Sequence, residues 1–210
     1  MKLLWNPARV PDQIMRLLQP RQHGKGGCGP PDAVSRTIPL MEIDPSALDI
    51  VIHPAQVLRQ VAKPVPAVDD SVRAVIERMT EVMEEYEGIG LAAPQVGLPW
   101  RLFVTRDPDE RRRVVAWINP ELEVVEPEEA SSEEGCLSLP GVLIHVSRPL
   151  CVRIKGLDEH GETAESISSD QFARVWQHEN DHLNGVLIID KMSSMDRIRN
   201  RRALREMKRG

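Results

Sequence analysis

The chain has no long apolar run, few cysteines and no excess of basic residues. A membrane-spanning helix needs about 20 consecutive apolar residues, and no run in the 210 residues approaches that length. The three cysteines form no CxxC pair, and no secretory signal precedes them, which indicates a reducing, intracellular setting. The net charge of −5 gives no general attraction to nucleic acid. With 41% apolar residues, the chain has enough apolar material for one soluble domain with a sizeable core.

The most informative segment present is WQHENDHLNG, residues 176–185, which contains an HExxH pattern. On a helix, residues four apart lie on the same face, so His178 and His182 can bind one metal ion. Glu179 is turned by roughly 100° from His178 and can reach a water on that metal without being a ligand. The segment therefore predicts a metal-binding helix with a carboxylate beside the metal.

A third ligand is needed, and its identity separates enzyme classes. Metzincin-type proteases continue to HExxHxxGxxH, but this chain has Ile188 where the third histidine would stand. Other zinc proteases take a later glutamate, and Glu206, the only one available, lies among basic residues and fits a surface position better. Upstream, Cys136 in the segment EGCLSLP is a stronger candidate, because a thiolate suits zinc or ferrous iron. The alternative for Cys136 is a buried structural thiol.

A third segment, GIGLAAPQ at residues 88–95, follows a predicted amphipathic helix near residues 70–87. Gly88 stands where a C-cap glycine belongs. In one interpretation the glycines only end the helix, and a buried strand follows. In the other, Gly88 and Gly90 let a ligand approach the backbone closely, with the Gln95 amide just beyond.

GxGLAxxQ, EGCLS and QHExDH, in this order, resemble the motifs of the peptide deformylase family. These enzymes remove the N-formyl group from the N-terminal formylmethionine of newly made polypeptides. The three motifs fall between Gly88 and His182, about half of the chain. A weaker resemblance extends from Leu48 to Asp190. Each motif alone is modest evidence, whereas the ordered set is highly specific.

The resemblance implies roles for individual residues. Cys136, His178 and His182 would bind one divalent metal, with Fe²⁺ favoured and Zn²⁺, Ni²⁺ or Co²⁺ as substitutes. The implied catalytic set is Glu179 as general acid/base, Gln95 and the backbone amide of Leu137 facing the reacting carbonyl, and Gly90 beside them. Ile89, Gly90 and Val175 would line the pocket for the methionine side chain. Gln95 could instead only tie one loop to another. Apart from the resemblance, Arg148 is predicted to pair with Asp181 or Glu134 and so to brace the metal strand against the metal helix; the alternative is a surface arginine without a partner.

The predicted fold is α+β, with antiparallel strands packed around the central HExxH helix and a basic C-terminal helix. Helix signals are Ser169 or Asp170 at the start of the metal helix and Gly185 at its end. Short strands are predicted from β-like runs separated by turn residues. These runs are 101–105, 114–118, 122–125, 143–146, 151–155 and 163–167.

The catalytic domain is assigned to residues 47–195, flanked by two unusual segments. Residues 1–46 form an N-terminal extension, rich in Gly and Pro, whose composition is typical of disorder or targeting. An organellar transit peptide and an over-long translated start before Met41 both remain open; otherwise a bacterial cytoplasmic enzyme is expected. Residues 196–210 form the basic helix, with seven Lys or Arg residues. This helix could contact ribosomal RNA, or could be a solvated helix packed through Ile198, Leu204 and Met207.

Two other functions are weighed against the deformylase hypothesis. A general zinc endopeptidase lacks its third histidine and a convincing downstream glutamate. A catalytically silent, metal-binding relative would have lost Glu179 or Gln95, and the chain retains both. Neither alternative accounts for residues 88–95 and 134–138 together. N-formyl-methionyl nascent peptides are therefore the expected substrates, with no membrane partner.

Overall fold

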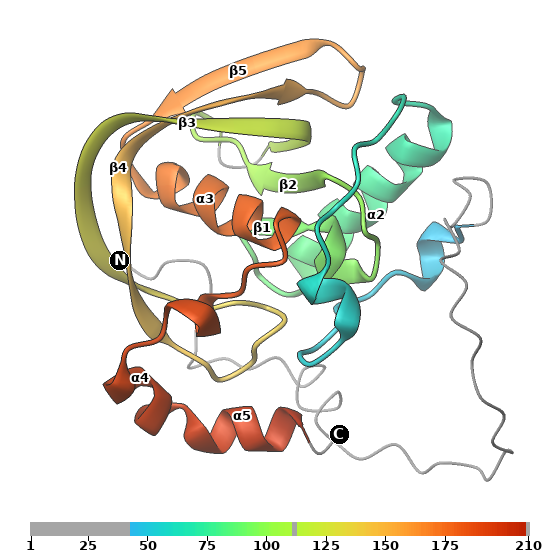
Figure 1. Ribbon diagram of the computed structural model, residues 1–210. Helices are drawn as coiled ribbons and strands as arrows, with labels where there is room; N and C mark the ends of the chain where they lie inside the picture. The colour runs from blue at the N-terminus through green and yellow to red at the C-terminus, as the bar shows by residue number, and fades with distance from the viewer. Residues whose placement is uncertain (1–42, 111–112, 209–210) are drawn as a thin grey trace, which may run out of the picture.

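The computed structural model describes residues 43–110 and 113–208 and has an α+β fold built on one antiparallel sheet (Figure 1). The five strands are β1 (Gly90–Ala92), β2 (Leu102–Arg106), β3 (Val114–Glu134), β4 (Ile144–Leu157) and β5 (Thr163–Ser168), and they follow one another across the sheet in sequence order. The helices are α2 (Asp70–Glu85), α3 (Gln171–Leu183), α4 (Ser194–Arg199) and α5 (Arg201–Met207). Short 3₁₀ helices are η2 (Pro45–Ala47), η3 (Gln56–Arg59), η4 (Ala93–Val96) and η5 (Ile188–Lys191). The predicted α+β class and antiparallel sheet are confirmed.

The first helix, α2, begins at an N-cap carboxylate and buries one apolar stripe. The Asp69 side chain accepts a hydrogen bond from the Val72 N–H. Its buried residues are Val72, Val75, Ile76, Met79, Val82 and Met83. At the other end, Glu87 rather than Gly88 adopts the left-handed conformation, with φ of 53°. Gly88 is one residue further on, and its N–H closes the helix by donating to Met83 O at 2.8 Å.

The strands β3 and β4 are longer than the sequence predicts. Four predicted short strands merge into this pair, whose register runs from Ile118 opposite Leu157 to Glu134 opposite Ile144. The expected break near Asn119 is an irregularity within β3, where Asn119 has φ of 52° and its side chain binds the backbone of Val65. Residues 126–133 are mostly polar and exposed, so they show no apolar alternation, but they pair with β4 and remain part of the strand. Figure 1 shows this long hairpin curving around α3.

The helix α3, which contains His178 and His182, is capped by Asp170 and ends at Leu183, two residues before Gly185. The Asp170 carboxylate accepts from the Phe172 N–H at 2.8 Å, which identifies Asp170 as the N-cap instead of Ser169. Gly185 has φ of 70°, and a Cβ there would lie 2.6 Å from Arg59 O. Both the left-handed backbone and the close approach require glycine.

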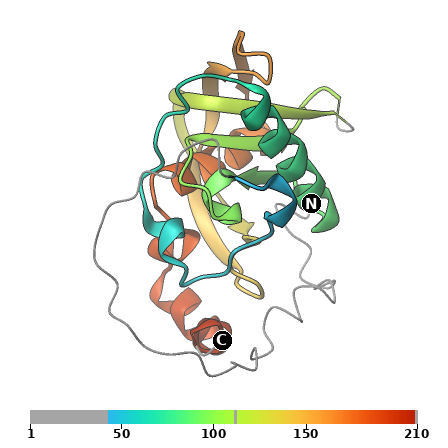
Figure 2. The ribbon, with the colours of Figure 1, turned by 90° about the vertical axis from the view of Figure 1, so that its right-hand side faces the viewer.

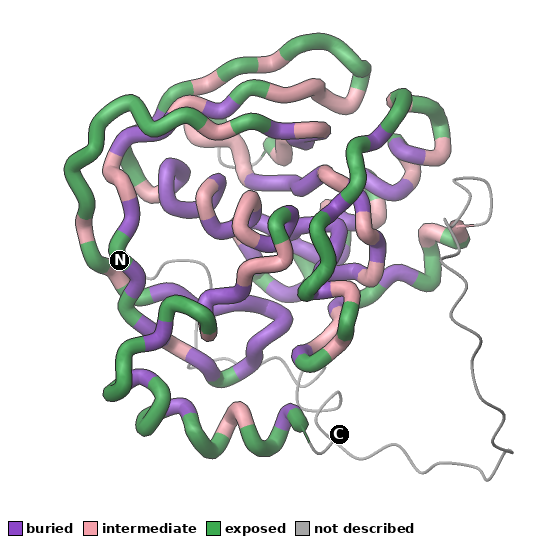
Figure 3. Tube along the Cα trace, viewed as in Figure 1, coloured by how far each residue is buried: buried purple, intermediate pink, exposed green. Residues whose placement is uncertain are grey.

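Alternate residues of the sheet pack against α2 and α3, which therefore cover opposite faces. Leu102 and Val104 belong to the apolar cluster that contains Met79 of α2, whereas Phe103 packs with Trp176 of α3. Figure 3 shows the buried residues concentrated in α3 and the strands beside it, with β3 exposed along its outer curve. The helix α3 thus packs against one face of the sheet, and the β3–β4 part of the same sheet curves around it.

The basic C-terminal segment forms two short helices rather than the single helix expected from Asp196 onward. The break falls at Asn200, because its side chain donates to Leu143 O at 2.9 Å and accepts from Leu143 N at 3.2 Å. Met207 is buried against the apolar cluster around Leu58, and Leu204 is partly buried there, but Ile198 is 69% exposed. The alternative of a solvated helix packed through Ile198, Leu204 and Met207 is therefore wrong for Ile198. The side view shows α4 and α5 together at the base of the molecule, below α2 (Figure 2).

The predicted N-terminal extension lies largely outside the described residues, as do Cys28 and Arg209. Within the described ranges, no helix has the length and apolar content needed to cross a membrane.

Candidate metal centre and active site

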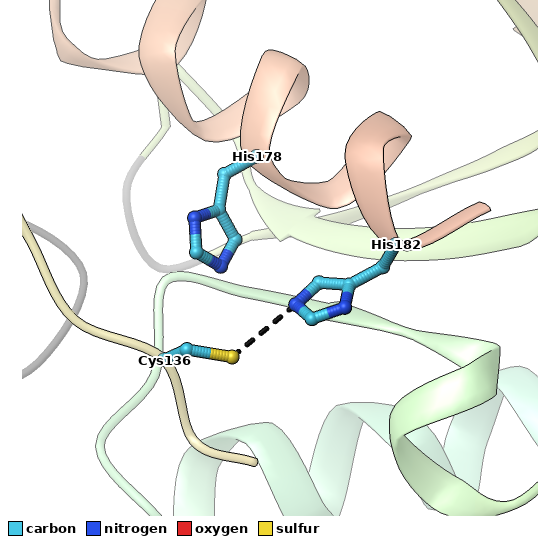
Figure 4. Close-up of side chains that lie close together, drawn as sticks. All are labelled: Cys136, His178 and His182. Atoms are coloured by element: carbon cyan, nitrogen blue, oxygen red, sulfur yellow. Dashed lines mark hydrogen bonds between the residues drawn. The ribbon is translucent and has the colours of Figure 1, made fainter. Parts of the chain in front are cut away.

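Three side chains that could donate to a metal ion converge in the interior, two from α3 and one from the loop after β3 (Figure 4). Cys136 follows the end of β3, and His178 and His182 lie one turn apart on α3. Their donor atoms all lie within 4.8 Å of one another, and all three residues are buried. Cys136 Sγ is 3.2 Å from His182 Nε2. One thiolate and two imidazoles this close together match the donor set of a Zn²⁺ or Fe²⁺ site.

The Glu134 carboxylate fixes the orientation of the His178 ring. Glu134 Oε2 lies 3.0 Å from His178 Nδ1. A carboxylate only accepts hydrogen bonds, so Nδ1 donates, and Nε2 is the ring nitrogen left for a metal ion. Burial opposes the charge of Glu134, but hydrogen bonds from His178 and Arg148 outweigh this effect and hold the pKa of Glu134 well below its usual range. Such a carboxylate–histidine contact is typical of metal sites.

Two buried arginines complete the surroundings of Glu134. Arg148 donates to both carboxylate oxygens, at 2.6 and 2.9 Å, and also to Asp181 on α3 at 2.9 Å. The predicted bracing role of Arg148 is therefore confirmed, with both suggested partners. Arg174 donates to the same carboxylate at 2.8 Å. The sequence motifs did not indicate Arg174, because its acceptors lie far away in the sequence and are brought to it only by folding.

The two histidines differ in their electrostatic environment. Burial lowers the pKa of His178, but contacts with Cys136 and Glu134 outweigh burial and raise it to about 10. Burial, together with the positive charges of His178 and Arg148, holds the pKa of His182 well below its ordinary value. The carboxylates and the thiol therefore favour a positive charge at the position of His178. A bound cation would satisfy the same preference.

Glu179 is buried against the backbone of β1. A Cβ built on Gly90 would lie only 2.5 Å from Glu179 Oε1, so any larger residue there would displace the carboxylate. Burial is the main reason that the pKa of Glu179 rises to about 7, although the positive charges of His178 and Arg148 oppose the rise. A carboxyl group with a pKa near neutrality can both accept and release a proton at physiological pH.

Gln95 presents its amide nitrogen to the thiol. Its Oε1 accepts from the Ala92 N–H at 2.8 Å, which leaves Nε2 directed toward Cys136 Sγ and Ser138 Oγ, each at 3.5 Å. Leu137 follows Cys136 directly, and its Cδ1 would lie 3.2 Å from a Cβ on Gly88. The three sequence motifs are thus packed together around one buried site.

Of the three residues predicted to line a methionine pocket, Gly90 and Val175 are in close contact, and Ile89 is the chain neighbour of Gly90. A Cβ on Gly90 would lie 2.9 Å from Val175 Cγ1, and Val175 is fully buried. Ile89 precedes Gly90 in the chain and is partly exposed. A separate hollow of about 430 Å³ lies beside α2, at Ile76 and Thr80, and is lined by none of the predicted site residues.

Fold and site together define the class of protein. The HExxH helix places two histidines and a buried glutamate beside a cysteine, a group that could hold a metal ion, and this arrangement is that of a metal-dependent hydrolase. The chain belongs to the polypeptide deformylase family, whose model matches residues 47–198. Its activity is that of this family, the hydrolytic removal of the N-formyl group from the N-terminal formylmethionine of newly made polypeptides.

Named relatives support this assignment over most of the chain. The chain is 45% identical over 153 residues to a peptide deformylase of Thermotoga petrophila, covering 73% of this chain and 92% of the relative. With a peptide deformylase of Pseudomonas aeruginosa the identity is 43% over 162 residues, 77% of this chain and 96% of the relative. The crystal structure of peptide deformylase from Thermotoga maritima is similar with a TM-score of 0.65 and 44% identity, over 70% of this chain and 97% of that one. A Plasmodium falciparum peptide deformylase structure gives a TM-score of 0.72 at 37% identity, over 77% and 95% of the two chains.

Proposed function

We propose that Cys136, His178 and His182 hold one divalent metal and that Glu179 is the general acid/base of deformylation. One observation carries this assignment: the three donors lie within 4.8 Å of one another, beside a buried carboxylate with its pKa raised to about 7. The donor set fits the metal, since His178 Nδ1 is occupied by Glu134 and its Nε2 is left for coordination. When bound, a divalent metal supplies Lewis-acid activation of water and of the formyl carbonyl.

Glu179 moves the proton that the reaction requires. It takes a proton from the attacking water as the new C–O bond forms at the formyl carbon. It then gives that proton to the amine nitrogen as the C–N bond breaks, so that formate and a free N-terminus are released. A positioned acid/base of this kind contributes about 10²–10⁴-fold in rate.

Gln95 and the Leu137 N–H stabilise the negative charge that develops on the formyl oxygen. The hydrogen bond from Ala92 N to Gln95 Oε1 supports this role, because it fixes which end of the amide faces the site. One preorganised donor is worth about 10²–10³-fold in kcat. Gly90 contributes by its lack of a side chain, which leaves room for the Glu179 carboxylate.

The methionine side chain is proposed to bind in a pocket lined by Ile89, Gly90 and Val175. Gly90 and Val175 are in close contact beside Glu179, where the Gly90 loop meets α3, so the proposed pocket lies alongside this contact and not between the two residues. Replacing Ile89 by alanine is expected to lower kcat/KM for formyl-Met peptides by about 10-fold, but less for formyl-Ala peptides. An equal loss for both substrates would remove Ile89 from the pocket.

Fe²⁺ is the proposed working metal, with Zn²⁺, Ni²⁺ or Co²⁺ as substitutes. The donor types alone fit all four ions, so anaerobic purification with metal analysis and activity in parallel is the test. Iron bound in near-stoichiometric amount, with activity that falls as Zn²⁺ replaces it, is expected. Replacing Cys136 by alanine should abolish tight metal binding. One tightly bound metal per chain in that variant would contradict the ligand assignment.

The basic segment 196–210 is proposed to attract the enzyme to ribosomal RNA. All described basic residues of α4 and α5 are exposed, namely Arg197, Arg199, Arg201, Arg202 and Arg205. Clustered Lys and Arg residues give salt-sensitive, sequence-independent binding to phosphates.

The enzyme is proposed to act in a bacterial cytoplasm, with residues 47–195 as its catalytic domain. Localising tagged chains that begin at Met1 or Met41 tests the compartment, and an organellar signal seen only with the longer chain would identify residues 1–46 as targeting.

A further inference from the structure

Arg174 is a buried arginine on the same side of α3 as the two histidines. It stands one turn before His178 and is 8% exposed. Burying a guanidinium is costly unless its donors are satisfied. Replacing a buried ion pair by apolar residues is often neutral or stabilising. A stabilising role is therefore a weak explanation for Arg174, and its three acceptors give a better one.

The first acceptor is the carboxylate that orients a proposed metal ligand. Arg174 Nη1 donates to Glu134 Oε1 at 2.8 Å, while Glu134 Oε2 contacts His178 Nδ1. Arg148 Nε binds the same Oε1, so two arginines hold that oxygen. The other oxygen is thereby directed toward the imidazole, and a shift of Glu134 would turn the His178 ring.

The other two acceptors are backbone carbonyls on both strands of the long hairpin. Arg174 Nη1 also donates to Val146 O on β4 at 2.8 Å, and Nη2 donates to Ala130 O on β3 at 2.6 Å. Ala130 lies six residues before Cys136 on the strand that leads to the thiol. The guanidinium thus links the helix that carries the histidines to the strand that carries the cysteine.

We propose that Arg174 is a positioning residue for the metal centre, because it fixes Glu134 and joins the β3–β4 hairpin to α3. This inference rests on the proposed function, since it takes Cys136, His178 and His182 as metal ligands. Two separate nitrogens reach acceptors on two strands, which a lysine with one nitrogen cannot reproduce. Arg174→Met keeps an unbranched apolar side chain but removes the guanidinium, and it leaves Glu134 paired with Arg148. Arg174→Lys keeps the positive charge but replaces the two Nη donors with a single nitrogen.

The test compares cobalt-loaded wild type, Arg174→Met, Arg174→Lys and Arg101→Met. Arg101 is the matched control, because it also ties α3 to the sheet, through Asn180, Asn184 and Pro120 O, without touching Glu134. The readouts are the cobalt–thiolate absorption spectrum, the cobalt dissociation constant and kcat and KM for a formyl-Met peptide. We expect an altered spectrum and affinity weakened by about 10–100-fold in Arg174→Met, with a fall in kcat at nearly constant KM. Arg174→Lys should be intermediate, and Arg101→Met should match wild type in spectrum and affinity.

The outcomes distinguish failure of the proposed metal ligands from failure of the proposed role of Arg174. Wild-type protein without a cobalt–thiolate band would contradict the proposed ligands themselves. A normal wild type, with Arg174→Met unchanged in spectrum and affinity, would overturn the positioning role alone. The same conclusion would follow if Arg101→Met showed the same changes as Arg174→Met. If Arg174→Met does not fold, an Arg174→Lys variant with wild-type spectrum and affinity overturns the proposal.

Discussion

At the scale of single residues, Glu179 combines burial, a raised pKa and direct contact with the β1 backbone. Glu179→Gln is expected to keep the metal and lower turnover by at least about 10²-fold, because it removes the proton-transfer group but not a ligand. Metal analysis and kcat on a formyl-Met peptide measure the two effects. Loss of metal would mean that the carboxylate is itself a ligand, and near-normal turnover would mean that another group moves the proton.

The sequence predicted more of the site than of its surroundings. Cys136, His178 and His182 each lie in a local motif with fixed chemistry, so they could be identified from spacing and resemblance, and the structure brings them together. Arg148 could be proposed because it lies near the motifs. Arg174 was missed, because an arginine in an otherwise apolar helical stretch gives no sign of the acceptors that long-range folding brings to it.

At the scale of elements, the N-cap of α2 makes a contribution to stability that depends on pH. Hydrogen bonds from the Ser71 hydroxyl and the Val72 N–H lower the pKa of Asp69 below its ordinary value. Because the folded-state pKa is lowered, the stabilisation is present above the unfolded-state pKa and is lost as pH falls through the folded-state value. Asn caps a helix about as well as Asp but does not titrate.

Asp69→Asn should therefore flatten the fall in unfolding free energy between about pH 5 and pH 2, with little change near the acid limit. Asp69→Ala should lose about 1 kcal/mol at neutral pH, because no cap remains. Urea unfolding across that pH range measures both. Parallel pH curves for wild type and Asp69→Asn would contradict the role of the Asp69 charge.

Helix boundaries were more predictable than strand boundaries for a physical reason. Capping side chains such as Asp170 act within a few residues, so they can be read locally. The polar part of β3 has exposed side chains and pairs mainly with β4, so no apolar alternation marks it. The break at Asn200 depends on a contact with Leu143, far away in sequence, and could not be inferred from the helical pattern.

At the scale of the whole molecule, the basic residues of α4 and α5 are exposed and include none of the proposed site residues, so they can be changed separately. Replacing Arg201, Arg202 and Arg205 by glutamate leaves Met207 and Asn200 in place, so the packing of the segment should persist. Activity on a short formyl peptide should be unchanged, while co-sedimentation with ribosomes at low salt should be lost. The matched control changes three other exposed basic residues, Lys63, Arg73 and Lys155, to glutamate. Equal sedimentation of both variants across a salt series would refute the docking proposal.

The central claim is that the convergent Cys/His/His group and Glu179 hydrolyse the formyl amide and not internal peptide bonds. The most direct measurement is formate release from formyl-Met-Ala-Ser by the anaerobically purified, metal-loaded protein, with peptide products followed in parallel. The account predicts one formate and one intact Met-Ala-Ser per substrate, and loss of both with Glu179→Gln. Cleavage within unformylated peptides, with formyl-Met-Ala-Ser left untouched by metal-loaded protein, would contradict it.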